Sequence, residues 1–143
     1  MIEKVIYKNK ILAIILYAKY RTKGINFFTP KSFSQQLGYM NRPKGYKIKP
    51  HLHKKITRKI EYTNEVLFIK SGIVRVDFYN NSKKYIKSKI LKKNDVILLI
   101  TGAHGFEMIS KSEIIEVKQG HYIEENYDKT RFKSIDADKV KIK

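Results

Sequence analysis

Short segments with a β-strand pattern recur along this chain at intervals of roughly ten residues, and this spacing constrains the fold more than any other feature. Most are rich in Ile, Val, Phe and Tyr, and Gly, Asn, Ser or Pro stand between them. Long amphipathic helical repeats are lacking. We therefore predict a single all-β domain, built as a sandwich or barrel. The predicted strands are residues 2–7, 11–20, 35–40, a strand through 51–53, 56–62, 65–70, 73–79, 85–91, 96–100, 105–109 and 113–117.

Turn-forming residues predict how some of these strands connect. Ser71-Gly72 separates two strand-like runs, which indicates a β-hairpin. Residues 24–30 predict a bend, and Thr29-Pro30 is compatible with the start of a single helical turn. Residues 11–20 fit a buried helix equally well by pattern, but their short length and β-rich surroundings favour a strand.

Histidines and one glutamate form a candidate metal site. His51 and His53 are separated by one residue, so on a strand they share a face and offer two converging nitrogens. Glu65 shares parity with Leu67 and Ile69, which directs its carboxylate toward the apolar side. An unpaired carboxylate there is costly, and a metal would offset that cost. His104 follows the apolar run 96–100 and supplies a third imidazole.

The spacing of these residues resembles the first motif of the cupin superfamily. Gly45 is followed after five residues by His51-x-His53, and Glu65 is followed after six residues by Gly72. The stretch 94–107, with its glycine at 102 and the third histidine, is similar to the second cupin motif. The gap of eleven residues between the second histidine and the glutamate is longer than in the usual motif, so a hairpin or excursion over 54–64 is expected.

This resemblance implies a cupin-like double-stranded β-helix, or jelly-roll, barrel over residues 41–120. N-terminal strands in residues 1–40 precede it, and a polar tail at 121–143 follows it. In cupins the matching residues, here His51, His53, Glu65 and His104, hold a divalent Fe, Mn, Ni or Zn ion. Such a set leaves coordination positions open for substrate, water or O2.

Small single-domain cupins of this kind are often encoded beside surface-polysaccharide and nucleotide-sugar genes. The expected function is therefore an enzyme acting on a sugar or nucleotide-sugar intermediate, as an isomerase or epimerase. A metal-dependent dioxygenase and a non-catalytic metal- or sugar-binding sensor remain alternatives. No catalytic base is assigned. Similar cupins form homodimers, and a homodimer is expected here. The apolar run 11–16 either provides its contact or packs in the core of its own chain.

Charge and composition limit the partners. The formal net charge is +18, but 26 of the 31 basic residues are lysine, whereas bidentate reading of phosphates and bases favours arginine. We therefore expect a small-molecule substrate and no nucleic acid. The lysines either fill solvated surface positions, which is the favoured interpretation, or attract an anionic substrate. No apolar run approaches the roughly 18–20 residues that span a bilayer, so no membrane partner is expected. The chain has no cysteine, and its N-terminal region does not match a signal peptide, so a cytoplasmic location is expected.

Alternation also assigns the residues near the predicted site. Phe106 shares parity with His104 and is expected to line the pocket, whereas Glu107 is expected to face away. His121 lies outside both motifs and is expected to be exposed. Lys118 and Tyr46 are weaker candidates for an acid, a base or a substrate anchor.

Overall fold

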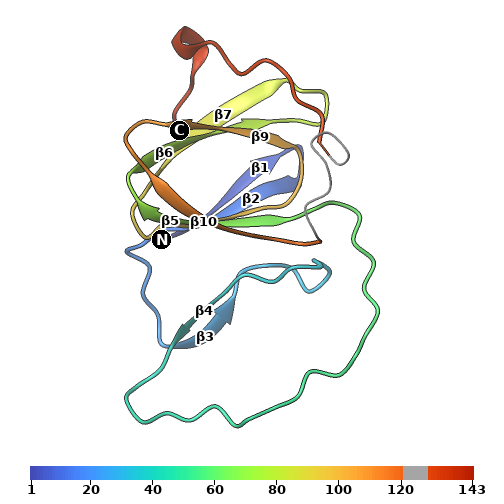
Figure 1. Ribbon diagram of the computed structural model, residues 1–143, viewed down its shortest axis with the longest axis vertical. Coiled ribbons are helices and arrows are strands. Elements are labelled where there is room, and N and C mark those ends of the chain that lie inside the picture. The colour runs from blue at the N-terminus through green and yellow to red at the C-terminus, as the bar shows by residue number, and fades with distance from the viewer. Residues whose placement is uncertain (121–128) are drawn as a thin grey trace.

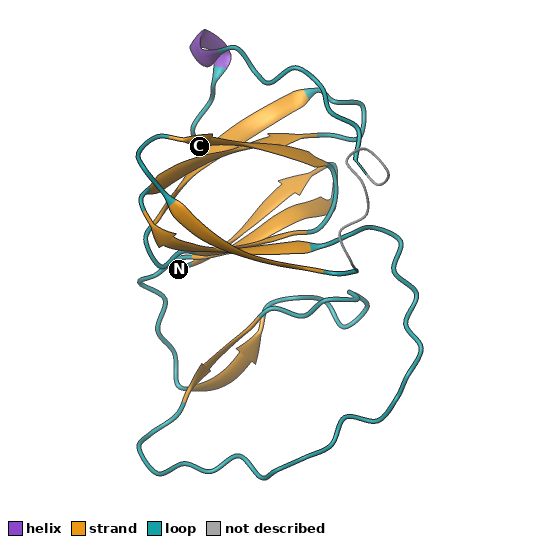
Figure 2. Ribbon diagram, in the orientation of Figure 1, coloured by secondary structure: helices purple, strands orange, loops and turns teal. Residues whose placement is uncertain are grey.

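The computed structural model describes residues 1–120 and 129–143, and it is built from short β-strands joined by turns and loops (Figures 1 and 2). One short 3-10 turn, Ala137–Lys139, lies near the C-terminus. The strands are β1 (Ile2–Tyr7), β2 (Lys10–Leu16), β3 (Gly24–Phe27), β4 (Gly38–Asn41), β5 (Glu65–Ser71), β6 (Ile73–Tyr79), β7 (Tyr85–Lys92), β8 (Val96–Leu99), β9 (Ala103–Met108) and β10 (Glu113–Lys118). The predicted all-β class is confirmed.

Two antiparallel sheets face each other across one hydrophobic core. The larger sheet has the order β1-β2-β8-β5-β10, and the smaller has the order β7-β6-β9. Side chains from both sheets form one buried cluster: Val5, Leu12, Ala13, Ile15, Leu67, Ile69, Val74, Val76, Phe78, Leu91, Ile97 and Leu99. Burying these side chains supplies the main favourable contribution to folding. The arrangement is of the β-sandwich type.

The alternation of side chains along β6 shows how sequence sets the two faces of the smaller sheet. Val76 and Phe78 lie in the core cluster, fully buried or nearly so. Arg75 and Asp77 point to the opposite face, where they pair with each other and are also buried. Both faces of this strand are therefore covered, one by the other sheet and one by the C-terminal segment.

The predicted hairpin at Ser71-Gly72 is wrong. β5 pairs with β8 and β10 in the larger sheet, whereas β6 pairs with β7 and β9 in the smaller one. The chain therefore crosses from one sheet to the other at this point. Gly72 has φ +86°, and a β-carbon there would meet the Lys111 carbonyl oxygen at 2.3 Å. A local glycine signal marks the reversal of the chain, but not which strands pair.

A second, smaller cluster covers the outer face of the larger sheet. Ile14, Leu98 and Ile100 pack there against Leu37, which belongs to the connection between β3 and β4. Residues 24–27, predicted to bend, form β3, and Thr29-Pro30 opens a turn rather than the predicted helical turn. Gln36 and the Thr29 hydroxyl fasten this connection by side-chain hydrogen bonds, which explains why a non-helical turn is stable there.

The apolar run 11–16 lies inside this chain. β2 is flanked by β1 and β8, and its side chains from Leu12 to Ile15 are buried in the two clusters. The run therefore packs in its own core and is not exposed as the predicted dimer contact. Among the described helical segments, none has the length and apolar character needed to cross a bilayer.

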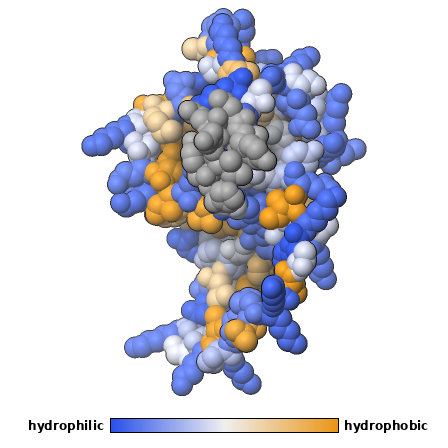
Figure 3. Space-filling model, turned by 45° about the vertical axis from the view of Figure 1, so that its right-hand side comes forward, coloured by the Kyte–Doolittle hydropathy of each residue, from blue (hydrophilic) through white to orange (hydrophobic). Residues whose placement is uncertain are grey.

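Residues 42–64 form an extended loop that leads away from the two sheets and returns to β5 (Figure 1). The predicted strands through 51–53 and over 56–62 do not form, although apolar side chains recur there among basic ones. An isolated extended segment lacks a ladder partner for its backbone groups, and water satisfies them instead. Leu52 is 92% exposed, and Figure 3 shows apolar side chains among hydrophilic ones over the lower part of the molecule.

We predict that Gly72→Ala lowers the free energy of unfolding by roughly 2–4 kcal/mol, since it combines left-handed backbone with overlap on the chain around residues 111–112. Gly24→Ala is the matched control. Gly24 has a similar φ of +82°, but its nearest neighbour is a side-chain atom at an ordinary 3.8 Å, so about 1 kcal/mol is expected. Urea unfolding measures the free energy of unfolding of both variants, and equal losses would contradict the close approach of residues 111–112 to Gly72.

Candidate functional site

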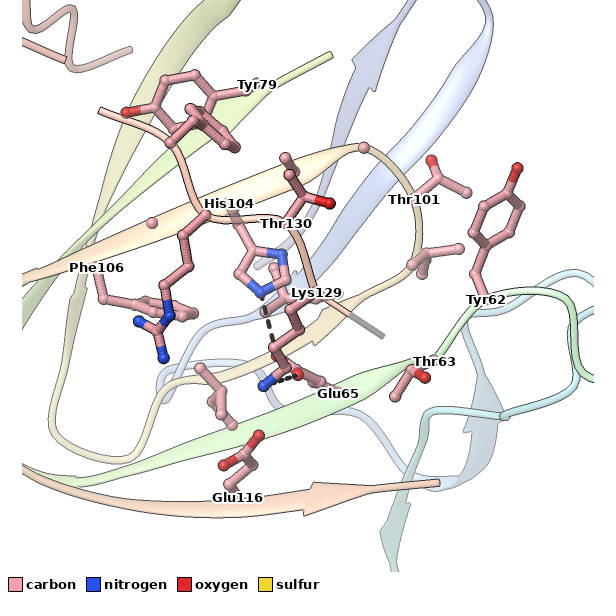
Figure 4. A pocket seen from close by; sticks show the side chains of 18 of the residues that line it. Tyr62, Thr63, Glu65, Tyr79, Thr101, His104, Phe106, Glu116, Lys129 and Thr130 are labelled. Atoms are coloured by element: carbon pink, nitrogen blue, oxygen red, sulfur yellow. Dashed lines mark hydrogen bonds and ion pairs between the residues drawn. The ribbon is translucent and has the colours of Figure 1, made fainter. Parts of the chain in front are cut away.

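A cavity of about 890 Å³ lies at one end of the two sheets, and Glu65 and His104 are on its wall (Figure 4). We call it the Glu65 cavity. Strands β5, β8, β9 and β10, residues 61–63 and residues 129–134 all contribute to it. Its polar lining residues include Tyr62, Thr63, Thr101, His104, Glu116, Lys129, Thr130, Arg131 and Ser134. A hollow of this size with a few convergent polar groups is typical of a small-molecule site.

Glu65 and His104 meet across the cavity wall from different sheets. Glu65 opens β5 and is 7% exposed, on the same face as the buried Leu67 and Ile69, which confirms the predicted direction of its side chain. His104 lies on β9 opposite Phe78, and its Nε2 is 3.1 Å from Glu65 Oε2. Phe106 follows on the same face, 5.3 Å between ring centroids, and lines the cavity as predicted.

The surroundings of Glu65 keep its carboxyl ionised. The hydrogen bond from His104 is the largest influence and lowers the pKa of Glu65, while burial opposes this and raises it. The positive charges of Lys129 and Lys118 lower the pKa further. Lys129 Nζ lies 3.8 Å from Glu65 Oε1. The net result is a pKa below the ordinary glutamate value, and so a carboxylate at neutral pH.

The Glu65–His104 pair determines which nitrogen of the His104 imidazole can accept a proton from a ligand. An ionised carboxylate only accepts hydrogen bonds, so Nε2 of His104 carries the proton that it donates to Glu65. In the neutral ring Nδ1 is then the base, and the carboxylate stabilises the imidazolium that forms when Nδ1 takes a proton. The His104 side chain is 27% exposed, which leaves part of the ring accessible.

The structure brings together two of the four predicted metal ligands. His51 and His53 lie on the exposed segment 42–64, with ring centroids 5.1 Å apart, and His51 Nδ1 is 3.0 Å from the Lys49 carbonyl oxygen. Within residues 1–120 and 129–143, no group of three or more His, Cys, Asp or Glu side chains is placed to hold a metal ion. As arranged, the described residues therefore do not fit a four-ligand site, and the metal prediction stays untested.

Other assignments near the site fall on different parts of the structure. Glu107 points to the far face of β9, as expected, and its carboxylate is 2.7 Å from Arg75. Tyr46 lies on segment 42–64, where Arg42 stacks 4.5 Å above its ring, and it is not part of the cavity lining. Lys118 ends β10 and contacts Glu116 at 3.9 Å. His121 lies outside the described residues.

Sequence reasoning missed the two cations that the C-terminal segment brings to the cavity. Lys129 and Arg131 line it although they are far in sequence from both motifs. Phe132 beside these two cations, in an otherwise polar C-terminal region, indicates that this stretch packs on the rest of the chain. The pattern does not predict where it packs. Thr63 and Glu116 also line the cavity, and they were not predicted because neither belongs to a recognisable motif.

No family model, curated protein or solved structure matches this chain. The resemblance to cupins therefore remains a hypothesis carried by the histidine, glutamate and glycine spacing.

We predict that Glu65→Gln removes an acid-sensitive contribution to stability. Because folding lowers the pKa of Glu65 below its ordinary value near 4.5, the carboxylate stabilises the fold above that pH. This contribution is lost as the pH falls through the lowered pKa. The difference in melting temperature between wild type and Glu65→Gln should therefore shrink as the pH is lowered from about 6 to about 3.

Glu61→Gln is the control for that experiment. Glu61 also lines the cavity, but its side chain is 67% exposed and pairs with an exposed lysine, Lys59. Its substitution should change the melting temperature little at any pH. A pH-independent effect of Glu65→Gln would show that the lowered pKa of Glu65 does not contribute to stability.

Proposed function

We propose that the Glu65 cavity binds a small anionic ligand of the carbohydrate type, a sugar phosphate or nucleotide sugar, and that His104 exchanges a proton with it. The observation that carries this proposal is the buried Glu65 carboxylate, which orients His104 in a cavity that Lys129 and Arg131 also line. Orientation by a carboxylate is what an imidazole needs to act as a general base or acid.

The charges around the cavity favour an anionic ligand. Two of its carboxylates have lysines of their own, Lys59 for Glu61 and Lys118 for Glu116. Glu65 accepts a hydrogen bond from His104 and lies 3.8 Å from Lys129. The whole chain carries a formal charge of +18, which raises the local concentration of anions at an open site.

The uncharged lining suits a ligand with many hydroxyl groups. Thr63, Thr101, Thr130, Tyr62 and Ser134 place hydroxyls around the cavity, and the ring of Phe106 provides an apolar face. Hydroxyl groups both donate and accept hydrogen bonds, so they can match a sugar in several orientations. The lining also holds the rings of Tyr79 and Phe132 and several aliphatic side chains, so the hydroxyl groups are what supports the carbohydrate class.

Isomerisation or epimerisation next to a carbonyl group is the reaction that the Glu65–His104 pair suits. Nδ1 of His104 would take the proton from the carbon beside the carbonyl, and the imidazolium would return it to the neighbouring carbon on the same face while the hydroxyl proton passes to the former carbonyl oxygen. Epimerisation would need a second group to supply a proton from the opposite face. Glu65 would stabilise the intermediate imidazolium, and no oxidant is required. Binding without turnover, as in a sensor, uses the same cavity without this step.

A second candidate keeps the metal-dependent cupin function, as an isomerase, epimerase or dioxygenase, and the cupin double-stranded β-helix. Residues 46–53 alternate in the strand period, and β9 pairs with β6 alone among the described strands. If that segment added along the other edge of β9, His51 and His53 would approach His104 on one face. Those histidines, Glu65 and His104 would then hold Fe, Mn, Ni or Zn.

We predict that His104→Gln weakens binding of UDP-glucose about tenfold or more, because it removes both the proton-exchanging nitrogen and the partner of Glu65. Isothermal titration calorimetry measures the affinity. His53→Gln, on the exposed segment, is the control and should leave the affinity unchanged if no metal is involved. Equal affinity of wild type and His104→Gln would contradict the proposed site.

Elemental analysis separates the two candidates. If the metal-dependent candidate holds, protein purified without an affinity tag contains near-stoichiometric Fe, Mn, Ni or Zn. That metal is then lost in the His51→Ala, His53→Ala double variant and in His104→Ala, since each removes ligand nitrogens. A metal content that is the same in wild type and double variant contradicts the metal-dependent candidate.

A further inference from the structure

The C-terminal residues 129–143 cross the outer face of the smaller sheet, and we call them the strap (Figure 1). Its far end is held by backbone hydrogen bonds to β7. The Ser88 N–H donates to the Lys141 carbonyl oxygen at 2.8 Å, and the Lys143 N–H donates to the Ser88 carbonyl oxygen at 3.3 Å. The Lys141 N–H also donates to the Tyr85 hydroxyl at 2.7 Å. The strap is therefore an integral part of this face of the sheet.

The near end of the strap is held by one aromatic residue of β6. The Phe132 ring packs edge-on against the ring of Tyr79, 5.0 Å between centroids and 88° between planes. The Ile135 N–H donates to the Tyr79 hydroxyl at 2.9 Å. Tyr79 is itself almost fully buried, so it provides a fixed anchor for the chain that passes over it.

The platform beneath the strap is a buried ionic network. Asp77 is 2% exposed and accepts two hydrogen bonds from Arg75, at 2.8 and 3.0 Å, and one from the Ser88 hydroxyl. Arg75 also contacts Glu107 on β9. This network links β6, β7 and β9 with paired charges, and a fully satisfied buried network of this kind is rigid.

The strap carries cationic groups into the Glu65 cavity immediately before its anchor. Lys129, Thr130 and Arg131 line the cavity, and the next residue, Phe132, lines it together with its partner Tyr79. Figure 4 shows Lys129 and Thr130 beside Glu65 and His104. Because Arg131 and Phe132 are adjacent, the position of the cations depends on whether the Phe132 ring is seated on Tyr79.

We propose that Tyr79 and Phe132 are positioning residues, and that seating of the strap and binding of an anionic group in the Glu65 cavity favour each other. This inference rests on the proposed function, and it adds the part of the chain that receives the ligand's phosphate. A ligand that contacts Lys129 and Arg131 binds only when these residues are held over the cavity. By linkage, the bound ligand then holds the strap on the sheet. If the strap is seated only part of the time, the apparent affinity falls by that fraction.

The test combines calorimetry with limited trypsin digestion followed by mass spectrometry. UDP-glucose and inorganic phosphate are the probes, and cleavage after Lys129 and Arg131 reports release of the strap. In the wild type, UDP-glucose should slow this cleavage at least about threefold, while cleavage within the exposed segment 42–64 should not change. Phe132→Ala should speed cleavage of the strap and weaken UDP-glucose binding about tenfold.

Matched variants separate positioning from general instability. Phe132→Tyr keeps the ring and should retain both affinity and protection. Phe27→Ala removes an aromatic side chain that is 61% exposed on β3, and it should change neither readout. Tyr79→Phe keeps the ring contact but removes the hydroxyl that holds Ile135, so it should give an intermediate rate of strap cleavage. The near-ultraviolet circular dichroism of each variant reports whether the fold is retained.

The outcomes distinguish this inference from the function on which it rests. Binding that requires His104 but is unchanged in a folded Phe132→Ala variant overturns the strap inference and leaves the proposed function standing. Cleavage of the strap that UDP-glucose does not slow, although UDP-glucose binds, also overturns the strap inference alone. Absence of binding of both probes by the wild type overturns the proposed function, and the strap inference with it.

Discussion

The carboxylate of Glu65 is the constraint on which the site depends. It begins a strand whose next inward residues, Leu67 and Ile69, belong to the apolar core, so its charge lies largely buried, at the border between this core and the cavity. An unpaired charge in such a place costs several kcal/mol, which is comparable to the stability of a whole domain. His104 must therefore lie beside it, and Lys129 adds a positive charge on the open side. The hydrogen bond that lowers the free-energy cost of burying this carboxylate also orients the imidazole of His104 toward the cavity.

The local pattern of the sequence was sufficient for what depends on alternation. Residues 2–7 and 73–79 form strands with the predicted bounds, and the inward direction of Glu65 and of Phe106 follows from parity alone. These features depend on neighbours one or two residues away. Side chains of a strand alternate whichever strand lies beside it, so no knowledge of the partner is needed.

What could not be predicted depends on contacts between distant residues. Ser71-Gly72 has the composition of a hairpin, but a reversal of the chain can lead into the same sheet or into the opposite one. The choice depends on whether β10 and β8 pair with β5 better than β6 would, and no short window holds that information. Lys129 and Arg131 reach the cavity only through the docking of Phe132 on Tyr79, a contact between residues more than fifty positions apart.

Segment 42–64 shows the limit of a pattern without a partner. Residues 46–53 have the alternation of a half-buried strand, which Lys54 and Arg58 then interrupt, and Leu52 and the residues around it are exposed. Alternation describes how a strand would divide between two environments, but the ladder of backbone hydrogen bonds needs an edge to receive it. The second edge of β9, the strand that carries His104, is one such edge, and the outer edge of β10 is another. The two candidate functions therefore differ in one physical event, the pairing of this segment, and in both the Glu65–His104 pair occupies the centre of the chemistry.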